Sequence, residues 1–116
     1  MRRLFIVIAL LLLTSPAALA FKGDCVLQVK GITYLDGSCE ISMEAGGNFQ
    51  VSTRSGRLYF ASVFPEGDGT ATASWNGTIP GATHAHSDLG TLKRQGACWI
   101  NEQAKVCAWR PGTRPR

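Results

Sequence analysis

Residues 38–60 read SCEISMEAGGNFQVSTRSGRLYF, and the alternation of apolar and polar side chains in this stretch decides the fold. Alternation with a period of two is typical of strands that are buried on one face only. A three-residue loop at Ala45–Gly47 sets Ile41 opposite Val51, and the apolar residues of both strands then share one face. A two-residue loop would shift the register by one residue and mix the two faces. The stretch therefore predicts an antiparallel hairpin with one apolar side.

Two short glycine-containing pairs predict the turns on either side of this hairpin. Ser55-Gly56 is expected to turn the chain into the next strand and to pair Val51 with Phe60. Asp36-Gly37 is a two-residue hairpin signal, because both residues tolerate a positive φ. The expected result is a meander of consecutive antiparallel strands.

The segment Cys98–Cys107, CWINEQAKVC, repeats this logic near the end of the chain. A four-residue loop at 101–104 sets Trp99 opposite Val106 and Cys98 opposite Cys107. Opposite residues of a non-hydrogen-bonded antiparallel pair are close enough for a disulfide. The register therefore predicts a hairpin closed by a cross-strand disulfide.

Short apolar runs separated by turn signals continue along the chain, and no segment after residue 20 has a long helical stripe. A sheet of this kind must cover its apolar face, and without helices it does so by curling on itself. We therefore predict an all-β fold, a small antiparallel β-barrel or sandwich of about eight short strands stapled by disulfides. The candidate strands are residues 25–30, 32–35, 38–43, 48–53, 57–64, 70–76, 89–95, 97–100 and 104–109.

Residues 1–20 have the pattern of a secretory signal peptide, with a positive start, an apolar centre and an Ala-Leu-Ala end. Cleavage there would release a chain that starts at Phe21, with a single β domain at 21–109 and a basic tail at 110–116 that we expect to be disordered. No cysteine stands at the cleavage point, so we expect no lipid or other membrane anchor. The sequence therefore predicts a periplasmic or secreted protein.

Four cysteines, an even number in a small exported chain, indicate two disulfides. Of the three pairings, we predict the two local ones, Cys25–Cys39 and Cys98–Cys107. The rival interpretation is a four-cysteine zinc site, but such sites usually contain close C-x₂₋₄-C pairs and the sequence has none.

The basic residues are concentrated outside the expected β domain. The sequence holds 12 Lys and Arg against 8 Asp and Glu, and the start of the chain and the tail at 110–116 contribute five of the 12 without any acidic residue. Residues 21–109 therefore carry 7 basic and 8 acidic residues, a net charge of −1. Because no basic stripe with interleaved aromatic residues is present, nucleic acid is a poor candidate partner.

The segment 83–90, THAHSDLG, contains the only two histidines of the chain. In an extended strand His84, His86 and Asp88 would lie on one face and offer three metal ligands. A single H-x-H without a second ligand cluster is weak support for a metal, so we expect a polar connection and no cofactor. The serines lack a nucleophile elbow or an S-x-x-K spacing, and a small filled barrel leaves little room for a substrate, so we expect no enzymatic activity.

Two short motifs and the C-terminal hairpin resemble a known family. Ser55, Gly56 and Tyr59 match an S-G-x-x-Y element, and Trp75-Asn76-Gly77 matches part of a downstream W-x-K-G element. Through these elements the chain resembles the periplasmic and membrane-bound inhibitors of c-type lysozyme, in their periplasmic, non-lipidated branch. The family lysine is absent here, one position is deleted, and the interval between the two motifs is longer.

The resemblance implies a compact β-barrel with a disulfide, whose loops enter the lysozyme cleft and place polar donors near its two catalytic carboxylates. Ser55 is the donor carried over from the family motif. The candidates to replace the absent lysine are His84, His86, Asn76 and Arg57. The residues expected at the partner interface are Ser55, Gly56, Tyr59, Trp75, Asn76, His84 and His86.

Two other classes stay open on the sequence. The first is a non-catalytic structural or interaction protein of the cell envelope with another partner. The second is a metal-binding protein that uses His84, His86 and Asp88. Both a monomer and a homodimer are compatible with the sequence.

Overall fold

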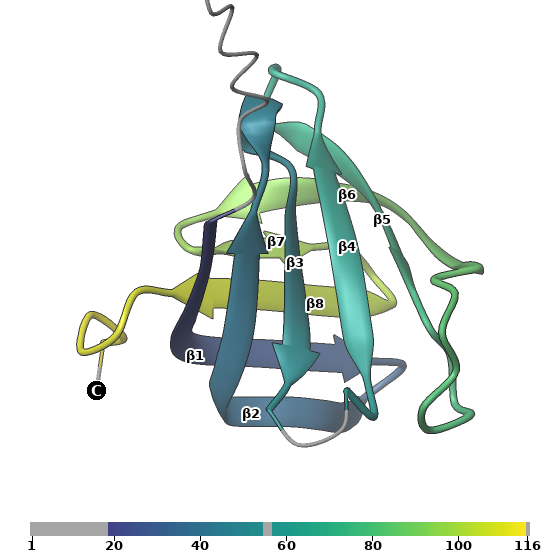
Figure 1. The fold of residues 1–116 in the computed structure, drawn as a ribbon. Helices are drawn as coiled ribbons and strands as arrows, with labels where there is room; N and C mark the ends of the chain where they lie inside the picture. Colours follow the sequence, from purple (N-terminus) through teal and green to yellow (C-terminus); the bar gives the residue numbers. More distant parts are fainter. Residues whose placement is uncertain (1–18, 55–56, 116) are drawn as a thin grey trace, which may run out of the picture.

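The computed structural model describes residues 19–54 and 57–115. The chain forms antiparallel strands that each pair with the next, and the last strand pairs with the first to close a barrel (Figure 1). The predicted all-β fold is confirmed, and the barrel is the architecture that forms. The strands are β1 (Leu19–Val29), β2 (Ile32–Met43), β3 (Phe49–Thr53), β4 (Phe60–Pro65), β5 (Thr70–Trp75), β6 (Ser87–Gln95), β7 (Cys98–Ile100) and β8 (Ala104–Trp109), with a 3₁₀ turn, η1 (Ala45–Gly47), between β2 and β3.

Two predicted hairpin registers are confirmed. Ile41 of β2 pairs with Val51 of β3, and Cys98 of β7 pairs with Cys107 of β8. In the first hairpin, a slip of one residue would turn the buried side chains to solvent, so the alternation of apolar residues is enough to fix the register.

The predicted turn at Asp36-Gly37 is wrong. These residues lie inside β2, where Gly37 pairs with Cys25 of β1, so two candidate strands form one long strand. The chain turns earlier, at Lys30-Gly31, where φ is 52° and 80°. Gly37 has a φ of 124° near the middle of β2, a strand that bends sharply around the barrel (Figure 1). Glycine inside a strand often marks such a bend at a barrel corner.

The register between β3 and β4 differs by one residue from the prediction. Val51 pairs with Ala61 and not with Phe60. Ala61 therefore belongs to the barrel core, while Phe60 packs on the other face, with the guanidinium carbon of Arg57 4.8 Å from its ring centroid. Phe60 and Arg57 line one pocket with Gly81, Ala82 and Thr83 of the β5–β6 connection. These neighbours of Phe60 come from a distant segment, so the hairpin sequence alone does not reveal them.

Both predicted disulfides are present, and none of the four cysteines is free. Cys25–Cys39 is buried in the barrel core and links β1 to β2. Cys98–Cys107 belongs to a second, smaller apolar cluster with Val26. Disulfides of small proteins form and persist in oxidising compartments.

Side chains from all eight strands fill the barrel interior. An eight-stranded barrel is just wide enough to be filled in this way. The strands β4 and β5 contribute three alanines, Ala61, Ala71 and Ala73, to the core. The largest apolar side chains with under 2 % exposure are those of Leu27, Ile41, Val51, Val63, Leu89, Leu92 and Val106.

Part of the C-terminal tail contacts the barrel. The Nη1 atom of Arg114 lies 2.9 Å from a carboxylate oxygen of Asp24 in β1 and 2.8 Å from one of Asp36 in β2. Its guanidinium carbon lies 4.8 Å from the ring centroid of Trp109. Hydrogen bonds to the Asp36 and Asp24 carboxylates raise the pKa of Arg114 above its ordinary value. The tail that we expect to be disordered is thus attached to the barrel at this residue.

Residues 1–18 of the predicted signal peptide lie outside the described part of the chain. Its last two residues, Leu19 and Ala20, begin β1 and pair with Met43 and Ser42 of β2. Among the residues that the structure describes, no helix has the length and apolar character needed to cross a membrane.

Candidate binding end of the barrel

Four connections lie at the same end of the barrel, which we call the loop end (Figure 1). Because consecutive strands run antiparallel, every second connection must emerge at the same end. The opposite end carries the β2–β3, β4–β5 and β6–β7 connections. The loop end comprises the β1–β2, β3–β4, β5–β6 and β7–β8 connections at residues 30–31, 54–59, 76–86 and 101–103.

The described residues expected at the partner interface belong to the loop end or to the strand ends beside it. The topology therefore brings Tyr59 of the first motif and Trp75-Asn76 of the second to one end of the barrel. The described members are Tyr59, Trp75, Asn76, His84 and His86, whereas Ser55 and Gly56 lie outside the described residues.

The rings of Tyr59 and Trp75 pack with the ring of Tyr34 under the loop end. The Tyr34 centroid lies 5.0 Å from that of Tyr59 and 4.7 Å from that of Trp75. The Tyr59 and Trp75 centroids are 6.4 Å apart. Aromatic pairs at these distances stabilise a structure beyond the area that they bury. Trp75 is only 5 % exposed, so the structure places it below the surface and not at its rim.

Asn76 is 1 % exposed and connects two loops. Its amide nitrogen donates to the carbonyl oxygens of Leu58 (2.9 Å) and Ala82 (3.1 Å). Its amide oxygen accepts a hydrogen bond from the N–H of Phe60 (2.9 Å). We expect Asn76 at the partner interface from the sequence. The structure instead uses its side chain to fix the β3–β4 connection against the β5–β6 connection.

The histidine segment is a loop followed by a β-bulge. His84 and His86 are exposed and precede β6, so they do not share a strand face with Asp88. Asp88 accepts a hydrogen bond from the N–H of Gly90 (2.8 Å) where the register between β5 and β6 shifts. In the described ranges, no three His, Cys, Asp or Glu residues are placed to hold a metal ion.

This bulge supports the neighbouring β7–β8 connection. The carbonyl oxygen of Leu89 accepts hydrogen bonds from the side-chain amides of Asn101 (2.8 Å) and Gln103 (2.9 Å). A bulge re-aims the residues around it and is often found at barrel rims. The sequence THAHSDLG therefore contributes to the shape of the loop end through its aspartate and its bulge.

Three exposed aliphatic side chains that the sequence analysis did not single out also lie here. Ile32, Leu58 and Ile79 are 56 %, 46 % and 69 % exposed and come from three different connections or the strand end beside one. The N–H of Gly81 donates to the carbonyl oxygen of Leu58 (2.9 Å), which ties two of the connections together. The only feature of the sequence that could have indicated their exposure is the position of each aliphatic residue beside a turn, where its side chain lies outside the core.

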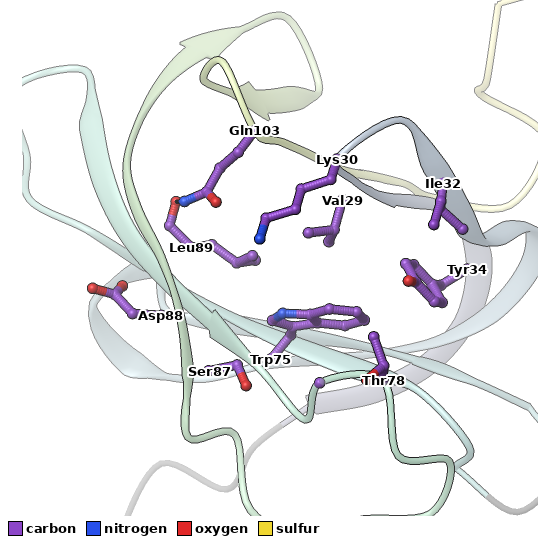
Figure 2. Close-up of a pocket in the computed structure, with 11 residues that line it drawn as sticks. Val29, Lys30, Ile32, Tyr34, Trp75, Thr78, Ser87, Asp88, Leu89 and Gln103 are labelled. Carbon is purple, nitrogen blue, oxygen red and sulfur yellow. Dashed lines mark hydrogen bonds between the residues drawn. The ribbon is translucent and has the colours of Figure 1, made fainter.

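A pocket of about 360 Å³ opens beside Ile32 (Figure 2). The indole of Trp75 and the side chain of Leu89 line it, and Tyr34 stands at its other side. The side chain of Lys30 reaches across it. The barrel interior is filled, as expected, and the pocket lies at the end of the core.

Comparisons with protein-family models, with curated proteins and with solved structures gave no match for this chain.

Proposed function

We propose that the chain is an exported protein, periplasmic or secreted, that inhibits c-type lysozyme by inserting its loop end into the active-site cleft. The proposal is carried by one observation: three exposed aliphatic residues lie on connections or strand ends at the same end of the barrel, together with Tyr59 and Trp75 of the two motifs. We call Ile32, Leu58 and Ile79 the apolar tip, and Tyr59 packs on Trp75 at this same end. Exposed apolar residues gathered in one place are typical of protein-interaction surfaces.

The loop end is held in place before any partner binds. The side chain of Asn76 bonds the backbone of Leu58 and Phe60 at the β3–β4 connection and that of Ala82 in the β5–β6 connection, and the Gly81–Leu58 hydrogen bond adds a further link. The Leu89 carbonyl fixes the β7–β8 connection in the same way. A surface that is ordered in advance loses less conformational entropy on binding, which favours tight association.

The charges of the loop end suit an acidic cleft. Its connections carry Lys30, Arg54 and Arg57 against Glu102, and Asp88 lies at the start of β6. The cleft of a lysozyme holds two carboxyl groups, one of which must stay protonated and the other ionised. A cationic or hydroxyl donor placed between them excludes the polysaccharide and disturbs that arrangement.

The test is a cell-wall lysis assay with c-type lysozyme and increasing amounts of the oxidised protein, for which we expect inhibition at micromolar concentrations or below. Leu58→Asp and Ile79→Asp each place a carboxylate at the apolar tip, and this charge would lose its water when the tip enters the lysozyme cleft. Each should weaken inhibition by roughly tenfold or more, since about 1.4 kcal/mol is a factor of ten. Phe64→Asp is the matched control, because Phe64 is also exposed but lies towards the opposite end of β4.

Ser55→Ala tests the donor that the resemblance implies. A hydrogen bond to a carboxylate contributes about 1.5–3 kcal/mol, so its loss should weaken inhibition by roughly 10- to 150-fold. If the folded, oxidised protein does not inhibit at micromolar concentrations, the proposal fails. The same loop end would then be assigned to another protein partner in the cell envelope.

A further inference from the structure

We propose that the pocket at the loop end binds a small organic carboxylate with an aromatic or aliphatic body. The pocket is lined in part by core residues; it shares Ile32 with the apolar tip, but Leu58 and Ile79 do not line it. Binding of a small carboxylate there is measured on this protein alone, so the inference does not depend on lysozyme inhibition.

The pocket has the size and the lining of a small-ligand site. Its volume of about 360 Å³ falls at the lower end of the roughly 300–1,000 Å³ that is usual for ligand pockets. Apolar atoms of Val29, Ile32, Trp75 and Leu89 line it, with the Tyr34 ring beside them (Figure 2). A ring or a short alkyl chain that enters removes its own apolar surface, and that of the exposed Ile32, from water, which is favourable.

Lys30 is the one cationic residue of the lining. Figure 2 shows its side chain crossing the pocket, with the ammonium group directed inward above the Trp75 indole. The one carboxylate of the lining, that of Asp88, points away from the pocket centre and accepts the N–H of Gly90. Within residues 19–54 and 57–115, the only ion pairs are those of Arg114, so Lys30 has no carboxylate partner there. A ligand carboxylate supplies that partner.

The backbone at Lys30 provides a second observation. Lys30 has a φ of 52° and occupies the first position of a two-residue turn in which Gly31 also has a positive φ. Asn, Asp and Gly are preferred at such a position, and other residues are strained there. The turn is fixed by a hydrogen bond of 2.7 Å from the N–H of Lys30 to the carbonyl oxygen of Gln103. Strain of this kind gathers at functional sites, and here it aims an ammonium group over a pocket.

The lining also argues against other ligand classes. An organic cation would meet Lys30 and would be repelled by it. A sugar that stacks on an aromatic ring needs an open ring face, and Trp75 is only 5 % exposed. A ligand with a small apolar group beside the Trp75 indole and an anionic group at Lys30 matches both the apolar and the charged part of the lining.

The probe is 3-phenylpropionate, with 3-phenylpropanamide as its uncharged match, titrated into the oxidised, isotopically labelled protein. We expect the carboxylate to shift the backbone amide resonances of Gly31, Ile32 and Tyr34 and the indole N–H resonance of Trp75. The amide should bind at least roughly tenfold more weakly because it lacks the charge-assisted bond to Lys30. High salt should weaken binding of the carboxylate and leave that of the amide unchanged.

The variant Lys30→Asn tests whether the Lys30 side chain contributes to binding without destabilising the fold. Asparagine suits the turn better than lysine, so the variant should unfold at the same or a higher denaturant concentration. Its affinity for 3-phenylpropionate should nevertheless fall by roughly tenfold. Lys93→Gln removes the same charge from β6 near the opposite end, where Lys93 pairs with Thr70, and should bind like the unchanged protein.

The inference is overturned if 3-phenylpropionate at millimolar concentrations shifts none of these resonances. It is equally overturned if the carboxylate and the amide bind with the same affinity, or if Lys30→Asn leaves the affinity for the carboxylate unchanged.

Discussion

The buried amide of Asn76 illustrates how a single side chain organises the loop end. Its partners are backbone atoms of Leu58, Phe60 and Ala82. Every residue has backbone N–H or carbonyl groups, so no pattern of side chains in the sequence predicts these hydrogen bonds. The Trp-Asn-Gly motif draws attention to the right residue, but only the fold shows that its side chain faces inward.

Asn76→Ala should lower the free energy of unfolding by about 2–3 kcal/mol, because it leaves the buried N–H of Phe60 and the carbonyl oxygen of Ala82 without their partner. The carbonyl oxygen of Leu58 loses one of its two hydrogen bonds and keeps that from Gly81. Urea denaturation measures the loss. Asn48→Ala is a suitable control: Asn48 is half-buried in the β2–β3 connection, and its side chain forms no hydrogen bond with the other described residues. Its effect should stay within about 0.5 kcal/mol. Equal stabilities of the two variants would contradict the role given to Asn76.

At the scale of the elements, the hairpins differ in how far the sequence determines them. The β2–β3 register follows from alternation on both strands, and the β7–β8 register places two cysteines opposite each other. The β3–β4 register differs by one residue from the prediction: Ala61 enters the core, and Phe60 lies on the other face beside residues 81–83 of the β5–β6 connection. Asp36-Gly37 has the composition of a turn, yet Lys30-Gly31 turns the chain first and the long β1 pairs with all of β2.

The same contrast applies to the candidate site. Tyr59 and Trp75 were identified from short motifs, and the antiparallel meander brings them together. The aliphatic tip and the pocket could not be predicted, because they depend on which connections share one end and on how deeply each side chain is buried. The sequence does not indicate a turn at Lys30, since lysine is not among the residues preferred at the first position of a two-residue hairpin turn.

The C-terminal tail depends on Arg114 for its contact with β1 and β2. Arg114→Gln removes two exposed ion pairs and a contact with Trp109, and should slightly lower the temperature of thermal unfolding at low salt. Salt at molar concentration should abolish most of this difference, because exposed charges are screened. Arg110→Gln, which removes a tail charge without an ion pair among the described residues, should have no measurable effect. Thermal unfolding of both variants at low and high salt measures the contribution of the Arg114 ion pairs.

At the scale of the whole molecule, the two disulfides act in different surroundings. Cys25–Cys39 lies in the main core, and the residues opposite its two cysteines are Gly37 and Gly23. A Cβ at Gly23 would come within 2.5 Å of both Ile41 and the carbonyl oxygen of Trp109, so this part of the barrel is tightly packed. Cys98–Cys107 belongs to a separate cluster with only one other buried residue, Val26. The inner bridge therefore combines a covalent link with core packing, and the outer bridge is mainly a covalent link.

Removing the inner bridge should cost more stability than removing the outer one, although they close loops of similar length. With sequence separations of 14 and 9, restriction of the unfolded chain alone gives about 3 kcal/mol for each. The double variant Cys25→Ala/Cys39→Ala also leaves a cavity in the core, which raises its expected loss to about 4–5 kcal/mol. Cys98→Ala/Cys107→Ala should lose about 2–3 kcal/mol. Denaturant unfolding of both variants measures the difference, and equal losses would show that chain restriction outweighs the packing of the inner bridge.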